Sequence, residues 1–282
     1  MRTFDRGWCI AQVRTATGLV TVVGALIGVK LGDSVLVRGT WTEHPKFGRQ
    51  LKATDCTADQ PADVSGVVSW MTSRLPEIGM RRARELVELF GVPGIWEIIE
   101  REPSRLSEVK GITPARVEQI CAAYHAHVAE RDRMVRLKTW GLTDNQIGRV
   151  ISQWGTDHVE AKLRENPYRL AEEVDGFGFL RADEVALRMG VARTSAFRIR
   201  AGVAHMLAEA AQRGHVYVPS GAVVKMTGEL LGIDPGLVAA ELAPCVGEGK
   251  AHIDGDRVYQ PRLHAAELGV AQQLAQICRR AA

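Results

Sequence analysis

The spacing of hydrophobic positions changes twice along the chain. Residues 4–60 carry apolar and polar side chains in short alternating runs between glycine-rich turns, which predicts a small β-barrel or curved sheet. From Val64 to about Met189 the apolar residues recur at helical spacing, and from Thr194 onward helices and short strands mix. The expected strands are Trp8–Val13, Leu19–Val23, Val35–Glu43 and Arg49–Asp55. The pattern therefore predicts a multidomain, mostly α protein with a β domain at its N-terminus.

Four turns in the helical region share one pattern. Each has an apolar residue at its centre, and each precedes a helix whose apolar face begins six residues after the turn starts. The turns start at Glu77, Gly111, Gly141 and Gly176, a period of 30 to 35 residues that indicates a tandem array. The four apolar faces are Ala83, Leu86, Val87, Phe90; Val117, Ile120, Cys121, Tyr124; Ile147, Val150, Ile151, Trp154; and Ala182, Val185, Ala186, Met189.

A longer repeat supports the array. Phe90-Gly91 is followed by Pro103 and then Arg105-Leu106, and Trp154-Gly155 is followed at the same spacing by Pro167 and then Arg169-Leu170. The unit that spans two turns is thus itself repeated, with an offset of 64 residues.

The start of a helix after each turn favours anions. Its first amide N–H groups have no partner within the helix, and the helix dipole adds partial positive charge there. Five residues after the turn starts lie Arg82, Arg116, Gln146 and Arg181, three of them arginine. Arginine at the same position after three of the four turns favours a phosphate-binding array. The alternative is a helical array in which the glycine turns only join helices.

Composition limits the chemistry. The net charge is only +3, so affinity for nucleic acid must come from local patches. The five cysteines are scattered without zinc spacing, which fits a reducing, cytoplasmic protein, and we expect no metal site. No signal peptide or apolar run of membrane length is evident, so we expect no membrane partner. The Walker sequence Gly-x4-Gly-Lys-Ser/Thr does not occur, so this chain is not expected to be an ATPase or another enzyme.

The order of these features resembles tandem helix-hairpin-helix DNA-binding motifs. Nearly the whole chain resembles the N-terminal region of RecD-like helicases, the RecD/TraA (exodeoxyribonuclease V alpha-type) group of superfamily 1 5′→3′ DNA helicases. The residues that carry the resemblance are Trp41–Gln50, Glu102–Leu106, Asn166–Leu170 with Gly176–Gly178, and His215–Pro219. Asn-Pro-Tyr-Arg-Leu before Gly-Phe-Gly is the most specific of them.

The resemblance implies an OB-like domain in which a further strand normally precedes the Trp8 segment, so this chain is expected to lack a strand or to start truncated. It also implies a motor domain directly after the matched region, and ATP and Mg²⁺ are expected only there. The expected domains are an OB-like β domain at 1–60, a tandem helix-hairpin-helix domain at 61–193, a winged-helix-like α+β module at 194–264, and the start of a helix towards the motor at 265–282.

The hairpins give the main candidate DNA-binding residues. The first, second and fourth hairpins are expected to bind phosphates through turn amides and arginines, whereas the third, which has Asp144 and Gln146 but no arginine, is expected to be structural. Glu77 stands where the family usually has glycine and puts a negative charge beside the first site. The candidate residues are Ile78, Gly79, Arg81 and Arg82; Gly111, Ile112, Thr113 and Arg116; and Gly176, Phe177, Gly178 and Arg181.

Two further segments are weaker candidates. Trp41, Lys46, Phe47 and Arg49 cluster on one β-hairpin, where an aromatic ring beside cations suits stacking on single-stranded bases. A core tryptophan beside a solvated basic turn is the favoured alternative. Lys250 and Arg257 flank a second hairpin, whose Asp254-Gly255 predicts a type I′ turn. That hairpin is expected to touch DNA as a wing or, equally, to form a packing or partner surface.

Three functions remain open from the sequence. The first is the DNA-binding N-terminal region of a RecD-like ATP-dependent helicase in recombination and repair, which contacts the backbone of single- or double-stranded DNA and lies in cis to the motor. The second is a scaffold that docks the motor or another repair protein. The third is an enzyme resembling helix-hairpin-helix DNA glycosylases, for which no catalytic Asp or Lys stands at a convincing place.

Overall fold

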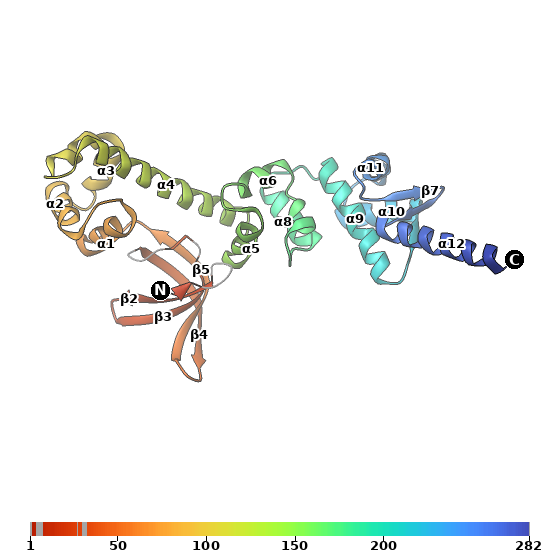
Figure 1. Ribbon diagram of the computed structural model, residues 1–282, viewed down its shortest axis with the longest axis horizontal. Coiled ribbons are helices and arrows are strands. Elements are labelled where there is room, and N and C mark those ends of the chain that lie inside the picture. The colour runs from red at the N-terminus through yellow and green to blue at the C-terminus, as the bar shows by residue number, and fades with distance from the viewer. Residues whose placement is uncertain (1, 4–7, 27, 30–32, 282) are drawn as a thin grey trace. The chain divides into compact units, whose positions relative to one another are not determined.

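The computed structural model describes residues 2–3, 8–26, 28–29 and 33–281, which form two compact units, residues 1–160 and 161–282 (Figure 1). The division falls inside the expected helical domain, between its third and fourth turns. The domain boundaries at 60, 193 and 264 therefore stay predictions.

The first unit begins with a five-stranded sheet in the order β1-β2-β3-β5-β4. All neighbours are antiparallel except β3 and β5, which pair in parallel where Val22 faces Leu51. The short strand β1 precedes the Trp8 segment, so the expectation that such a strand is lacking is wrong. Residues 4–7 and 30–32 of the predicted β region lie outside the described residues. The strands are β1 (Arg2–Thr3), β2 (Trp8–Thr15), β3 (Gly18–Ala25), β4 (Ser34–His44) and β5 (Gly48–Asp59).

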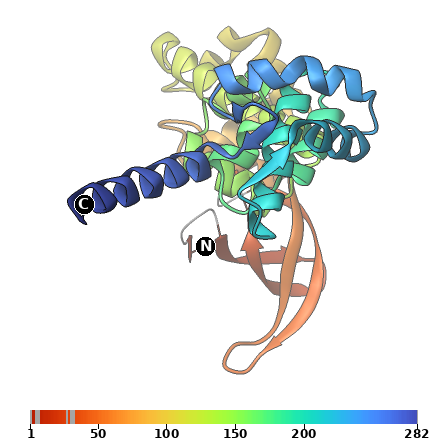
Figure 2. The ribbon, with the colours of Figure 1, turned by 90° about the vertical axis from the view of Figure 1, so that its right-hand side faces the viewer.

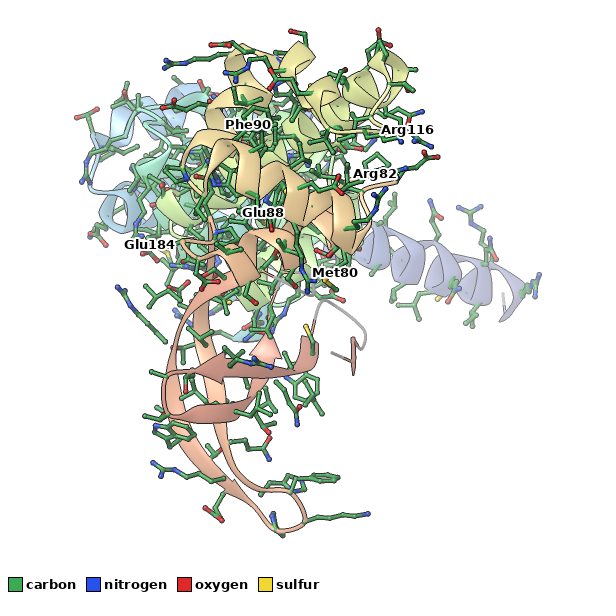
Figure 3. All side chains as sticks on the ribbon, turned by 90° about the vertical axis from the view of Figure 1, so that its left-hand side faces the viewer. Met80, Arg82, Glu88, Phe90, Arg116 and Glu184 are labelled. Atoms are coloured by element: carbon green, nitrogen blue, oxygen red, sulfur yellow. The ribbon has the colours of Figure 1, made fainter. Side chains whose placement is uncertain are left out.

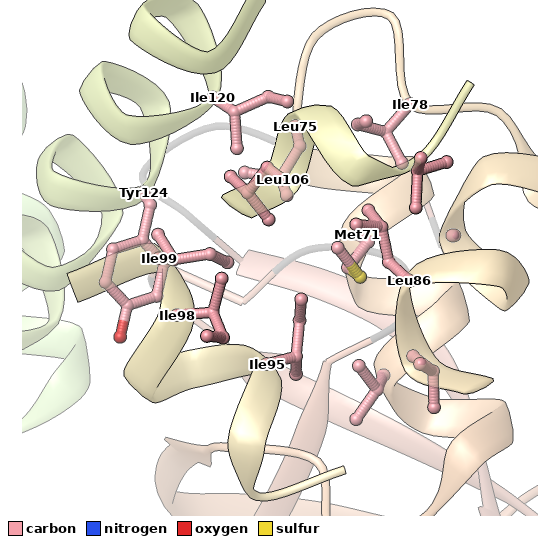
Figure 4. Close-up of a cluster of buried hydrophobic side chains, with 14 of the residues drawn as sticks. Met71, Leu75, Ile78, Leu86, Ile95, Ile98, Ile99, Leu106, Ile120 and Tyr124 are labelled. Carbon is pink, nitrogen blue, oxygen red and sulfur yellow. The ribbon is translucent and has the colours of Figure 1, made fainter. Parts of the chain in front are cut away.

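The helices between Val64 and Thr139 pack around one apolar core (Figure 4). Ile78 and Ile112, the central residues of the first two turns, belong to this core, as do Leu86 and Ile120 from the helices that follow them. The apolar faces predicted after the first two turns are therefore confirmed. The elements are α1 (Val64–Arg74), α2 (Met80–Phe90), α3 (Gly94–Arg101), the 3-10 helix η2 (Pro103–Glu108), α4 (Pro114–Thr139) and α5 (Asp144–Trp154), with α6 (Val159–Glu165) at the division.

A buried ion pair joins the β domain to the helices of the same unit. Arg74, at the end of α1, donates from Nε to Asp33 Oδ1 at 2.8 Å, and its Nη1 lies 2.8 Å from His127 Nδ1. The side chains of Arg74 and Asp33 are only 3% and 2% exposed. Because both charges are removed from water, each depends on the other for compensation.

The second unit begins with α7 and α8 and continues into helices that carry a three-stranded sheet in the order β6-β8-β7. Helices and short strands mix in it as predicted, and the mostly α, multidomain fold class is confirmed. The elements are α7 (Arg169–Glu173), α8 (Phe179–Arg188), α9 (Ala196–Gln212), β6 (Tyr217–Pro219), α10 (Ser220–Leu231), α11 (Pro235–Gly247), β7 (His252–Asp254), β8 (Arg257–Tyr259) and α12 (Pro261–Ala281).

A buried network explains the Asn-Pro-Tyr-Arg-Leu motif. The hydroxyl of Tyr168, which is fully buried, donates to Asp183 on α8 at 2.7 Å. Arg198, on α9, donates to both oxygens of Asp183 at 2.8 and 2.9 Å and also to the carbonyl of Leu231 at 3.0 Å, at the end of α10. Burial raises the pKa of Tyr168, and its bond to Asp183 raises it further. The motif thus ties the helix after the fourth turn to the rest of the unit.

The turn between β7 and β8 differs from the prediction. Asp254 pairs with Arg257, so the two central residues are Gly255 and Asp256. Gly255 has φ of 58°, whereas Glu77 is the only non-glycine with positive φ in the described part of the chain. A type I′ turn needs positive φ at both central residues, so the prediction is wrong, and glycine at the first of them fits type II′.

No single described helix is long and apolar enough to cross a membrane. The pair α10 and α11 passes that test together by length and composition, with a bend of 117° between the two helices.

The buried ion pair generates a stability prediction. Arg74→Ala leaves the Asp33 carboxylate buried without its guanidinium and should lower the free energy of unfolding by about 3–5 kcal/mol. Arg81→Ala, which removes a pair whose partners are 71% and 36% exposed, should cost less than about 1 kcal/mol. Urea unfolding followed by circular dichroism measures both. Equal losses in the two variants would contradict the prediction.

Candidate nucleic-acid interface

The four turns adopt one backbone conformation. The first residue of each has positive φ, and the third caps the following helix in an extended conformation with ψ between 160° and 169°. The central apolar residue points inward in every case. The first-residue φ values are 57° at Glu77, 89° at Gly111, 93° at Gly141 and 80° at Gly176, and the central residues Ile78, Ile112, Leu142 and Phe177 are 3–6% exposed. The side chains of Ile78, Ile112 and Phe177 are therefore not available to a ligand, so only their backbone can contribute to binding.

The helix starts of the first, second and fourth hairpins carry no side-chain cap. The carbonyls of Gly79, Thr113 and Gly178 each accept the amide four residues later, at 3.0 to 3.1 Å. None of these residues bonds a first-turn amide through its side chain, although Thr113 has a hydroxyl group. The amides in between have no acceptor within the helix, and the helix dipole makes this end favourable for anions.

The helix start of the third hairpin is already bonded to other residues of the first unit. Thr143 and Gln146 form a capping box, and the first-turn residue Asp144 is 6% exposed. Asp144 accepts the amide of Cys56 on β5 at 2.9 Å and lies 3.0 Å from Lys138 Nζ. Burial raises the pKa of Asp144, and Lys138 acts against that shift. These contacts support the expected structural role, because the start of this helix is docked on the sheet.

The first and second hairpins contact each other. Arg82 donates to the carbonyl of Glu77 at 3.1 Å, and Arg116 donates to the carbonyl of Gly111 at 2.5 Å, so each arginine closes its own turn. Arg116 Nε also donates to Glu77 Oε2 at 2.6 Å. A methyl group in place of the Gly111 hydrogen would lie 3.0 Å from Arg82 Nη2. We call this arrangement of Glu77, Arg82, Gly111 and Arg116 the paired-hairpin site; its two arginines lie side by side in Figure 3.

The paired-hairpin site contains a contact that the sequence does not predict. The positions of Arg82 and Arg116 follow from the repeat, but the repeat does not show that Glu77 reaches the arginine of the next hairpin. The only signal was an acidic residue in a position where the pattern has glycine. Arg81, the neighbour of Arg82, lies apart from these contacts and pairs with Glu85 at 3.2 Å.

The fourth hairpin belongs to the second unit and has its own ion pairs. Arg181 pairs with Glu184, which also lies 2.8 Å from Arg188, and the hydrogen bond from Arg181 holds the pKa of Glu184 below its usual value. Leu180, in the same first turn, is 65% exposed. Arg181 therefore contacts a carboxylate of its own helix, whereas Arg116 contacts one on a neighbouring hairpin.

The hairpin between β4 and β5 presents aromatic side chains to solvent. Trp41 is 50% exposed and Phe47 is 67% exposed, so the favoured expectation of a core tryptophan is wrong. The Arg49 guanidinium lies 4.3 Å from the Trp41 ring centroid, and Lys46 Nζ lies 5.7 Å from that of Phe47. Phe47 lies in the turn between His44 and Gly48, at the tip of the hairpin, which extends past the part of the sheet where β3 pairs with β5 (Figure 2). Trp41 pairs with Leu51 and lies on β4, the strand at the edge of the described sheet.

Lys250 and Arg257, the two candidate DNA contacts beside the β7–β8 turn, differ in how far their charges are already paired. Lys250 is 15% exposed and lies 3.0 Å from Glu172 and 3.3 Å from Glu248, so its charge is already paired within the unit. This speaks against Lys250 as a DNA contact. Arg257 lies over the Tyr217 ring, 5.2 Å from its centroid, and Tyr217 is 44% exposed.

The residues that the structure describes contain no group of three or more His, Cys, Asp or Glu that could hold a metal ion.

Comparison with known proteins adds two family matches. A family described as "ATP-dependent DNA helicase YrrC, OB-fold domain" matches residues 2–61, and one described as "ATP-dependent RecD2 DNA helicase HHH domain" matches residues 126–217. The chain is 26% identical over 268 residues to the ATP-dependent RecD2 DNA helicase of Deinococcus radiodurans, a match that covers 89% of this chain and 37% of that protein. Residues 2–61 and 126–217 therefore match an OB-fold domain and a helix-hairpin-helix domain of RecD-like helicases, and the first two hairpins lie between the two matched segments.

The paired-hairpin site generates a second stability prediction. Gly111→Ala puts a side chain on a backbone with φ of 89° and within 3.0 Å of Arg82, and it should cost about 1–3 kcal/mol of unfolding free energy. Gly94→Ala, at a position with open space at the start of α3, should change that free energy by less than about 0.5 kcal/mol. Thermal unfolding of the two variants checks the difference, and a Gly111→Ala protein as stable as Gly94→Ala would refute it.

Proposed function

We propose that this chain is the non-sequence-specific DNA-binding N-terminal region of a RecD-like, ATP-dependent 5′→3′ DNA helicase that acts in recombination and repair. The observation that carries the proposal is the paired-hairpin site, where two arginines and two helix starts lie together on the surface of one unit. The chain spans 37% of the length of the curated relative it matches, so the helicase activity and a motor domain that binds ATP and Mg²⁺ belong to the proposal. A cytoplasmic location is part of it as well.

The geometry favours contact with the DNA backbone. Amide and guanidinium donors at a helix start complement phosphate oxygens, and such contacts hold a protein on DNA without reading bases. Arg82 and Arg116 supply guanidinium groups on the first unit, and Arg181 supplies one on the second. A net charge of only +3 makes these local groups decisive, because the bulk charge of the chain attracts DNA weakly.

The arginines provide the direct test. The triple change Arg82→Ala, Arg116→Ala and Arg181→Ala should weaken binding to every DNA sequence by about tenfold or more. It should also reduce the slope of log affinity against log salt by about 2 to 3, because each lost phosphate contact accounts for roughly 0.7–0.9. Fluorescence anisotropy with labelled DNA at several salt concentrations measures both quantities.

A matched control removes the same charge elsewhere. Arg84→Ala, Arg101→Ala and Arg213→Ala replaces three exposed arginines outside the four turns and the first turn of each following helix, two on the first unit and one on the second. This variant should keep most of the affinity and slope of the wild-type chain. An unchanged salt slope in the hairpin variant would refute the proposed function.

The β4–β5 hairpin is proposed as a second contact, to single strands. Exposed rings beside cations stack on bases, with about 1–3 kcal/mol per stacked base. Trp41→Ala with Phe47→Ala should therefore weaken binding to single-stranded DNA by at least about fivefold and leave duplex binding nearly unchanged. Leu36→Ala, at a 61% exposed apolar position on the same β4 strand, serves as the control. Equal loss on both DNA forms would contradict this role.

The competing function is a protein-interaction scaffold. It is favoured by the docking of the third hairpin on β5 and by the 65% exposed Leu180 at the fourth hairpin, which suits a protein surface better than a phosphate. Retardation of short DNA by this chain on a gel at low salt distinguishes the two functions, because a scaffold has no reason to retain DNA.

A further inference from the structure

Glu77 occupies a position where its backbone is unfavourable. The equivalent residues of the other three turns are glycine, and all four have positive φ. A residue with a Cβ atom pays for this conformation, and glycine does not. The turn itself therefore gains nothing from glutamate, and the reason for the side chain must be sought in what its carboxylate contacts.

Glu77 belongs to the first hairpin, but its carboxylate contacts the second hairpin. Its Oε2 accepts a hydrogen bond from Arg116 Nε at 2.6 Å, while the main-chain carbonyl of the same residue accepts one from Arg82 at 3.1 Å. The side chains of Arg116 and Glu77 are 34% and 56% exposed, so this ion pair faces solvent. Glu77 thus accepts hydrogen bonds from both arginines of the paired-hairpin site. Its negative charge lies at the surface where a phosphate would approach these arginines.

We propose that the Glu77 carboxylate is an internal competitor that a DNA phosphate must displace from Arg116. This inference rests on the proposed function. A carboxylate and a phosphodiester oxygen both accept hydrogen bonds from a guanidinium, so the Nε donor of Arg116 that Glu77 now holds serves one or the other. After displacement the carboxylate remains close to the bound backbone and repels it. Glu77 therefore sets the affinity of the first two hairpins below what their two arginines would give.

Competition also changes the response to salt. Arg116 neutralised by Glu77 adds little net charge to the site, so a phosphate that binds there releases less of its counterion atmosphere than it would at an unpaired arginine. Removal of the carboxylate should make the dependence of log affinity on log salt steeper, by up to about 0.7–0.9 for the one phosphate concerned.

The experiment compares Glu77→Gln and Glu77→Gly with Glu88→Gln. Glu88 is exposed on α2, the helix that follows the turn, and lies away from the turn (Figure 3). Glu88→Gln makes the same change in net charge as Glu77→Gln. Anisotropy titrations with one labelled duplex at about 50 to 200 mM salt give affinity and slope. Both Glu77 variants should bind about two- to fivefold more tightly than Glu88→Gln, the range that exposed ion pairs allow, and with a steeper slope.

A double-mutant cycle ties the effect to Arg116. In an Arg116→Ala background the Glu77 carboxylate has no guanidinium to compete for. Glu77→Gln should therefore tighten DNA binding no more than Glu88→Gln does. Circular dichroism of each variant verifies that the helices are intact.

The outcomes separate this inference from the proposed function. Should Glu77→Gln bind no more tightly than Glu88→Gln, or more weakly, while the triple arginine variant is impaired, competition is wrong and Glu77 is instead a clamp that orients Arg116. Should the triple arginine variant bind like the wild-type chain, the proposed function itself fails, whatever Glu77 does. An equal gain from Glu77→Gln with and without Arg116 would also overturn competition.

Discussion

The helical part of the chain depends on the burial of one apolar side chain at the centre of each turn. Ile78, Ile112, Leu142 and Phe177 are all nearly inaccessible to solvent. With this residue turned into the core, the residue before it takes a left-handed conformation and the residue after it begins a helix. The amides at that helix start then face away from the core. A packing constraint thus creates the polar surface, and the side chains around each turn decide whether that surface stays open.

The four turns share one backbone conformation, but the side chains at their helix starts make different contacts. In the third, Asp144 is taken up by Cys56 and Lys138, so the helix start serves to attach the β domain. In the first and second, each arginine closes its own turn, and Arg116 also reaches across to the carboxylate of Glu77 on the first hairpin. In the fourth, the arginine pairs along its own helix with Glu184. The repeat accounts for the shared geometry, and residues outside the repeat account for the differences.

Much of the fold follows from the sequence because its signals are local. The helix after each turn and the strands of the β domain were predicted from spacing and turn residues. One error is local, the type of the turn between β7 and β8, and the others concern contacts between distant segments. The exposure of Trp41 depends on the place of β4 at the edge of the described sheet, and the pairing of Lys250 depends on Glu172, 78 positions earlier in the numbering. For the site, the sequence predicted the arginines but not their partners, because spacing does not reveal which hairpins touch.

The helix α4 connects two of these features. It starts at the second hairpin, whose Arg116 lies in the paired-hairpin site, and near its other end Lys138 bonds Asp55 of β5 at 2.7 Å. Its 26 residues make a rod of about 39 Å at 1.5 Å per residue. Within the first unit, α4 therefore keeps the paired arginines and the contact between Lys138 and the sheet at a fixed distance along one helix. A displacement of one end of α4 moves the other end as well, because no flexible linker lies between them.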